Sequence, residues 1–252
     1  MTTGRTVTAS DMITRCKKLK GNWATRNKKF RDWYEILRLT DTLAQEGMES
    51  VTTNDPRTGY NLGRHLLVTA IIAHKIDQED LTPEQLMGTS YLETYVGKRW
   101  AEHETRYRQM GRQGFIWQLV SDLLAFGWYN IFSMVDEEKI WSEIWSPSET
   151  SQAFDENGMA EVVHTYTVQP SVANRKAKLF GWPMKQPLKV PATMYDHWGY
   201  DDNGDIANFV ILDKDFLKTP EVDPAMTKLL RFPVFSSPVG GLPDTGSVDG
   251  KW

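Results

Sequence analysis

The sequence predicts an α+β fold, in which helices occupy the first half of the chain and a mainly antiparallel β region follows. Up to Gly127, apolar residues recur every three or four positions, as on one face of an amphipathic helix. After Gly127 they alternate, as in strands with one buried face. Two segments typical of tight turns, Glu156-Asn157-Gly158 and Asp201–Asp205, separate the later strand-like segments and predict hairpins.

A basic amphipathic segment opens the chain. Ser10 is the predicted N-cap of a helix that continues through the thirties and weakens near Gly21-Asn22. Apolar positions recur there at intervals of three, four and seven, which predicts one buried stripe. The predicted stripe consists of Ile13, Cys16, Lys20, Trp23, Phe30, Trp33 and Leu37.

The next region alternates between helix signals and a break. The segment Glu46–Tyr60 interrupts the helical pattern, and NDPRTG within it predicts a turn. Leu62–Ile76 is apolar and β-branched, so helix and strand both remain open. Thr82-Pro83-Glu84-Gln85 is a good helix start and predicts a helix to about Met110. A further helix is predicted over Phe115–Phe126, with Ile116, Leu119, Val120, Leu123 and Leu124 on its buried side.

The second half reads as hairpins. Predicted strands cover 128–135 and 140–145, 152–155 and 159–168, and 193–200 and 206–212, with a short helix over 171–179 and a loop at Pro183, Pro187 and Pro191. From Pro233 the chain is rich in Pro, Gly and Ser, and we expect no strand or helix there. The expected regions are a basic helical segment (1–50), a helical region (51–127), a β-rich region (128–232) and a connecting segment (233–252).

Composition excludes several classes of protein. The chain has 252 residues, of which 40% are hydrophobic and 25% charged, as in an ordinary globular protein. Its longest apolar stretches are far too short to span a bilayer, and MTTGRTVTASD has no apolar core of a secretory signal. Because Cys16 is the single cysteine, an intrachain disulfide and a cysteine-based zinc site are excluded. That cysteine content suits a reducing compartment.

Charge is distributed unevenly. Residues 1–31 hold nine basic residues and one acid, a balance of +8, whereas the remaining 221 residues carry −12. A basic head suggests an electrostatic partner, either DNA or an acidic protein surface, while an ordinary solvated helix face is the simpler reading. The spacing of Trp23, Phe30, Trp33 and Tyr34 favours core or interface over base stacking. The candidate contact residues are Arg15, Lys17, Lys18, Lys20, Arg26, Lys28, Lys29 and Arg31.

Searches for catalytic and metal-binding motifs end without a candidate. Asp201, Asn203 and Asp205 resemble the start of a calcium loop, but Leu212 stands where a bidentate glutamate is required, so a β-turn is expected. His103-Glu104 lacks the second histidine of a zinc-protease helix. No nucleophile elbow, phosphate loop or dinucleotide fingerprint occurs. We therefore expect no catalytic residues, no metal and no cofactor.

Several stretches, taken in order, carry a family resemblance. They are RDWYEILRLTD (31–41), NDPRTGYNLGRHLLVT (54–69), YVGKRWAEHETRYRQMGRQGFIWQLVSDLLAFGWYNIFSMVD (95–136), QAFDENGMAEVVHTYTVQPSVA (152–173) and FPVFSSPVGGLPDTGS (232–247). In this order they resemble the N-terminal part and wing region of tailed-bacteriophage portal proteins. The likeness lies in the succession of loose motifs from Ser10 to Ser247.

The resemblance implies a structural role. Portal proteins form rings, usually of twelve subunits, at one capsid vertex. The implied partners are further copies of the chain, the major capsid protein, terminase, head–tail adaptor proteins and the double-stranded DNA in the channel, with no membrane. The implied location is the virion, and the host cytoplasm during assembly. Portal proteins continue into a clip and long stem helices, so we expect this chain to be the front part of a longer product or a shortened relative.

Two other classes of function stay open. One is a nucleic-acid-binding module whose basic helical arm binds duplex DNA in a salt-dependent way. The other is a carbohydrate-binding or hydrolase domain on the tryptophan-rich β half, where Trp141 and Trp145 share a strand face. That face fits an oligomer interface equally well. A carbohydrate or hydrolase function requires a cleft with convergent carboxylates. Within the portal resemblance, we expect the head to contact a neighbouring subunit or capsid protein.

Overall fold

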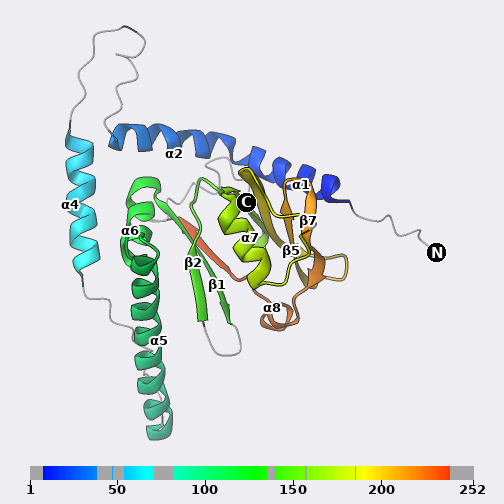
Figure 1. Cartoon of the computed structure of the whole chain (residues 1–252). Coiled ribbons are helices and arrows are strands. Elements are labelled where there is room, and N and C mark those ends of the chain that lie inside the picture. Colours follow the sequence, from blue (N-terminus) through cyan, green and yellow to red (C-terminus); the bar gives the residue numbers. More distant parts are fainter. Residues whose placement is uncertain are drawn as a thin grey trace.

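A computed structural model describes residues 8–38, 47, 54–70, 82–135, 140–156, 158–184 and 186–238 (Figure 1). It confirms an α+β fold in which all strand pairs are antiparallel. The helices are α1 (Ala9–Asn22), α2 (Ala24–Leu37), α4 (Asp55–Thr69), α5 (Pro83–Gln109), α6 (Phe115–Phe126), α7 (Pro170–Leu179) and α8 (Pro224–Leu229). The strands are β1 (Trp128–Val135), β2 (Ile140–Ile144), β3 (Thr150–Asp155), β4 (Gly158–Val168), β5 (Ala192–Tyr200), β6 (Ile206–Leu212), β7 (Asp215–Val222) and β8 (Val234–Pro238).

Helices α1 and α2 form a bent rod across the top of the molecule (Figure 1). The predicted break is confirmed, at Trp23. The predicted cap is wrong by two residues, because Thr8 accepts from the Asp11 amide at 3.2 Å and so caps α1 in place of Ser10. The stripe of α1 packs on the sheet through Cys16 and Leu19. Burial raises the pKa of the Cys16 thiol to about 12, which keeps the thiol protonated.

The buried stripe is only partly as predicted. Trp23 and Phe30 are buried, whereas Trp33 is 54% exposed and Lys20 is also exposed. The buried positions Cys16, Leu19, Trp23, Arg26 and Phe30 keep a spacing of three and four across the bend. The stripe therefore passes through Leu19 in place of Lys20 and ends before Trp33.

Helix α4 contradicts the turn predicted over NDPRTG. The helix begins at Asp55, and Pro56 stands in its first turn, where a proline has no intrahelical donor to lose. The helical alternative holds for 62–69, while 71–76 lies outside the described residues. Helix α4 runs alongside α6 and has no buried residue of its own (Figure 1).

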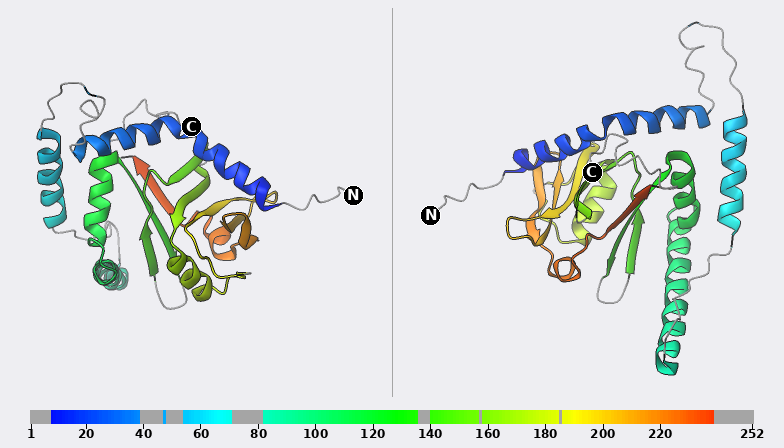
Figure 2. Two further views of the ribbon diagram at one scale, coloured as in Figure 1. Left: turned by 45° about the horizontal axis from the view of Figure 1, so that its top comes forward. Right: turned by 180° about the vertical axis from the view of Figure 1, so that it is seen from behind.

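Helices α5 and α6 agree with their predicted bounds. Thr82 and Gln85 form the expected capping box at the start of α5. Gly127, in the left-handed conformation at φ 64°, ends α6 and lets β1 begin at once. The predicted buried side of α6 is wrong at Leu124, which is 38% exposed, whereas Asp122 is buried. Figure 2 shows α5 extending well beyond the sheets.

One sheet has three strands in the order β2-β1-β8. The predicted hairpin of β1 and β2 is confirmed, with Ile131 opposite Ile144. The expectation that no strand follows Pro233 is wrong, because β8 pairs with β1 from Trp128↔Pro238 to Phe132↔Val234. Prolines stand before and at the end of β8, positions at which a missing amide donor is tolerated.

The other sheet has five strands in the order β3-β4-β5-β6-β7. Both predicted hairpins, β3–β4 and β5–β6, and the helix α7 are confirmed. The turn expected at 201–205 is also present, because Asp201 Oδ1 accepts from the amides of Asn203 and Asp205. Strand β7 and helix α8 were not predicted. The core between the two sheets contains Trp145, Val162, Trp198, Ile206, Phe232 and Val234.

A buried hydrogen bond joins α5 to the three-stranded sheet. The Ile144 amide donates to the hydroxyl oxygen of Tyr107 at 2.9 Å, and both residues are buried. Tyr107→Phe leaves this amide without an acceptor, and we expect a loss of about 1–2 kcal/mol of unfolding free energy. Urea unfolding measures it. Tyr91→Phe, at a 70% exposed position of the same helix, is the control, and equal stabilities would contradict the prediction.

Candidate functional site

The rod of α1 and α2 is anchored by a buried arginine. Arg26 is 1% exposed, and its guanidinium lies 3.9 Å from the centre of the Trp23 ring. It donates to the carbonyls of Thr150 at 2.7 Å and Pro147 at 3.0 Å, and to Gln152 Oε1 at 3.3 Å. Burial lowers the pKa of Arg26 to about 9, which still leaves it charged at neutral pH. The contacts of Arg26 therefore lie within the chain.

A buried polar network continues from this anchor into both sheets. Gln152 Nε2 donates to Asn130 Oδ1 at 2.8 Å and to Ser236 Oγ at 2.7 Å. The Trp23 indole donates to the carbonyl of Gln152 at 2.6 Å. Gln152 thus connects the rod, β1 and β8 through one side chain and one carbonyl.

The other predicted contact residues lie along the rod. Arg15 pairs with Glu161 at 2.6 Å, and Lys28 pairs with Asp32 at 2.8 Å. The structure therefore gathers most of the predicted basic residues on one exposed element. The remaining predicted residues have exposed side chains: Lys17, Lys18, Lys20, Lys29 and Arg31.

Helices α2, α4 and α5 leave large apolar side chains exposed. Exposed apolar side chains that form a patch mark protein interaction surfaces. Here they form two groups, one on α2 and α4, which contact each other, and one in the first turns of α5. Met87 and Tyr91 on α5 are 77% and 70% exposed, and Leu66 on α4 is 60% exposed. We call the following residues the exposed apolar set: Trp33, Tyr34, Ile36, Leu62, Leu66, Leu67, Leu86, Met87, Tyr91 and Leu92.

Acidic residues gather at one end of the five-stranded sheet. The antiparallel order places the β3–β4 turn, the β5–β6 turn and the end of β7 at that same end. Backbone hydrogen bonds from Asp205 and Asn203 lower the pKa of Asp201. This end therefore carries charge opposite to that of the rod. Its acidic residues are Asp155, Glu156, Asp201, Asp202, Asp205, Glu221 and Asp223.

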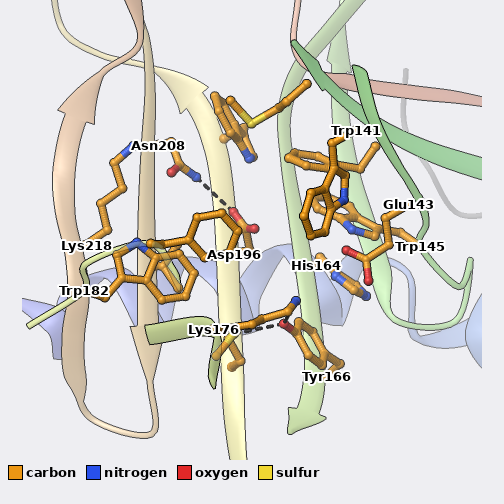
Figure 3. A pocket seen from close by; sticks show the side chains of 16 residues that line it. Trp141, Glu143, Trp145, His164, Tyr166, Lys176, Trp182, Asp196, Asn208 and Lys218 are labelled. Carbon is orange, nitrogen blue, oxygen red and sulfur yellow. Dashed lines mark hydrogen bonds between the residues drawn. The ribbon is translucent and has the colours of Figure 1, made fainter. Parts of the chain in front are cut away.

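An aromatic pocket of about 370 Å³ lies between the two sheets and α7 (Figure 3). Phe132, Trp145, His164 and Tyr166 form a continuous series of stacked rings along it, with successive ring centres 4.4–4.7 Å apart. Trp141 and Trp145, which were predicted to share a strand face, both line this pocket, although β2 ends at Ile144 and leaves Trp145 just beyond the strand. We call this cavity the aromatic pocket.

Charged groups from separate elements point into the aromatic pocket. Figure 3 shows the carboxylates of Glu143 and Asp196 and the ammonium of Lys176 directed into it. Lys176 donates to the Tyr166 hydroxyl at 3.1 Å, and Asn208 donates to Asp196 at 2.9 Å. Lys218 of β7 also lines the pocket.

The pKa values of these groups reflect their enclosure. Burial raises the pKa of Asp196. Burial alone would lower the pKa of Lys176, but the Glu143 carboxylate and Tyr166 outweigh it and raise that pKa. The cleft with convergent carboxylates that the sequence could not reveal is therefore present, because β2, β5 and α7 meet there. In the sequence, the one sign of this cleft is that Trp141, Glu143 and Trp145 alternate and so fall on the same side of an extended segment.

Two further observations bear on the kind of site. Within the described ranges, no group of three or more histidine, cysteine or acidic side chains is placed to hold a metal ion. Over the same part of the chain, no helix is long and apolar enough to cross a bilayer.

No protein-family model matches the chain, and no curated protein is detectably similar to it in sequence.

Proposed function

We propose that this chain is a structural subunit of a phage portal ring at the capsid vertex. The exposed apolar set carries the proposal, because three helices present large apolar side chains to solvent. In the proposed ring a second copy of the chain covers them. The opposite charges of the rod and of the acidic sheet end support contact between copies. In a ring each copy presents two different faces to its two neighbours. The basic face of one copy can therefore contact the acidic face of the next, and the opposite charges favour that contact.

The order of sequence motifs supports the portal assignment within the class of ring proteins. In this reading the chain forms the front and wing part of a subunit, and the ring carries the DNA channel and docks the packaging and tail proteins. The chain itself performs no chemistry. Its partners are further copies, the major capsid protein, terminase, adaptor proteins and the packaged DNA.

The first test is assembly after charge reversal on the rod. Replacing Lys17, Lys18, Lys28 and Lys29 by glutamate should shift the native mass from a closed oligomer toward the 28.9 kDa subunit. Mass photometry of the full chain measures this, and negative-stain images show whether the wild type forms rings. The matched control reverses four exposed lysines outside the rod: Lys178, Lys189, Lys214 and Lys228.

The outcomes separate the two leading functions. A wild-type chain that stays monomeric at all concentrations would overturn the ring proposal. Unchanged assembly of the rod variant, together with lost binding to duplex DNA, would favour the nucleic-acid-binding module instead. In that case the affinity for DNA should fall with salt at a log–log slope of about −0.9 for each neutralised phosphate.

A further inference from the structure

We propose that the aromatic pocket binds a neutral sugar ring, so that the chain recognises carbohydrate in addition to its proposed structural role. This inference does not rest on the ring proposal, because the pocket lies within one copy between the two sheets. It rests on the juxtaposition of stacked aromatic rings with two carboxylates and two ammonium groups around one cavity (Figure 3).

Size and access fit a small ligand. A volume of about 370 Å³ lies within the range of natural ligand pockets. Trp141 and Trp182 line the pocket and are only partly buried, so their rings are open to an entering molecule. The rings are held in place, because Trp141 and Phe180 lie 6.2 Å apart and Phe180 stacks on Trp182 at 4.9 Å.

The apolar walls match one face of a sugar. A pyranose presents C–H groups on its faces and hydroxyls around its edge, and the faces of indole rings pack against such C–H groups. In the stacked series from Phe132 to Tyr166 the rings cover one another's faces, so this series fixes the shape of the pocket and turns ring edges toward it. The partly buried Trp141 is a ring that can offer a face to the sugar. Trp182, from the loop after α7, provides a second ring at the pocket (Figure 3).

The polar groups match the edge of a sugar. Glu143 and Asp196 are acceptors, while Lys176 and Lys218 are donors, so the charges of the pocket nearly balance. A hydroxyl both donates and accepts, and it can therefore serve either kind of group. The indole N–H of Trp198, a further lining residue, is buried without an acceptor in the part of the chain that the structure describes.

The same balance disfavours other ligands. A purely apolar ligand would exclude water from Glu143 and would add no donor to the one that Asn208 already gives Asp196, which costs free energy for each carboxylate. A cationic ligand would compete with Lys176, which already lies 5.4 Å from the Tyr166 ring centre. A flat heterocycle carries a fixed set of donors and acceptors at its edge. It therefore offers fewer hydrogen-bonding groups to the four charged side chains than the hydroxyls of a sugar do.

The test is direct binding to the full chain. Methyl glycosides of glucose, galactose, mannose and N-acetylglucosamine, with maltose, cellobiose, lactose and chitobiose, are titrated by saturation-transfer NMR and tryptophan fluorescence. Adenine, indole and choline are the rival probes. We expect at least one sugar to bind, and Trp182→Ala to weaken it by about tenfold, the effect of losing one aromatic contact.

Two further variants complete the design. Asp196→Asn keeps the shape of the side chain and should also weaken sugar binding, which covers the case that Trp182→Ala fails to fold. Phe235→Ala, at a 54% exposed position on β8 outside the pocket, is the control and should bind as the wild type does. Absence of binding by all eight sugars, equal binding by the pocket variants, or tighter binding of a rival probe would each overturn the proposal.

Discussion

Replacing Arg26 with methionine should destabilise the chain by about 3 kcal/mol, because it leaves the carbonyls of Thr150 and Pro147 buried without donors. Methionine retains much of the apolar stem, so the loss reports the guanidinium rather than the packing of the side chain. The loss should be local as well as global, since the same side chain stacks on Trp23 where α1 meets α2. Urea unfolding and limited proteolysis of the rod measure the two effects.

Lys28→Met is a matched control for this variant, because Lys28 is an exposed base on the same helix that forms an ion pair with Asp32. Exposed ion pairs contribute little, so the control should stay within about 0.5 kcal/mol of the wild type. Arg26→Lys keeps the positive charge but loses the planar set of donors, and we expect an intermediate loss. Equal stabilities of Arg26→Met and Lys28→Met would show that the anchor is not energetically important.

Asp122→Asn should stabilise the chain at neutral pH. Asp122 lies on α6 with its Oδ2 atom buried and without a hydrogen-bond donor among the described residues. Burial, with a smaller contribution from Glu149, raises the pKa of Asp122 from 3.8 to about 7. The folded chain therefore holds this proton more tightly than the unfolded chain does.

The sign of the pH dependence follows from that difference. The contribution of Asp122 to stability is complete below pH 3.8 and is lost as the pH rises through about 7. The gain from Asp122→Asn should thus appear between those values and reach at most about 4 kcal/mol above them. Unfolding free energies from pH 4 to 8 test this, with Asp202→Asn on an exposed turn as the control. Parallel profiles for wild type and Asp122→Asn would contradict the prediction.

The sequence was sufficient for much of the fold, because its signals there are local. Thr82 with Gln85, Gly127 and the turn at 156–158 each act through bonds or dihedral angles within a few residues. The α+β class and three hairpins followed from them. The bounds of α4 did not, because NDPRTG suits a turn and a first helical turn alike, and packing against α6 decides between them.

The two candidate sites differ in the same respect. The charged rod could be predicted because charge is a property of composition. The burial of Arg26 among the predicted basic contact residues could not be predicted. Arg26 resembles its basic neighbours in the sequence, and only the approach of Thr150 and Gln152 from β3 distinguishes it. The aromatic pocket requires Glu143, Lys176 and Asp196 to meet from three distant segments, and no local pattern predicts that meeting.

The pairing of β8 with β1 has a consequence for how the chain reaches its fold. Trp128 lies opposite Pro238, so one edge of β1 stays without its partner until nearly all of the intervening β region has been synthesised. Until then β1 and β2 form a two-stranded hairpin, which is marginal alone in water. The five-stranded sheet, whose strands are neighbours in the chain, has no such delay. We therefore infer an order of folding in which the five-stranded sheet forms first and β8 completes the three-stranded sheet last.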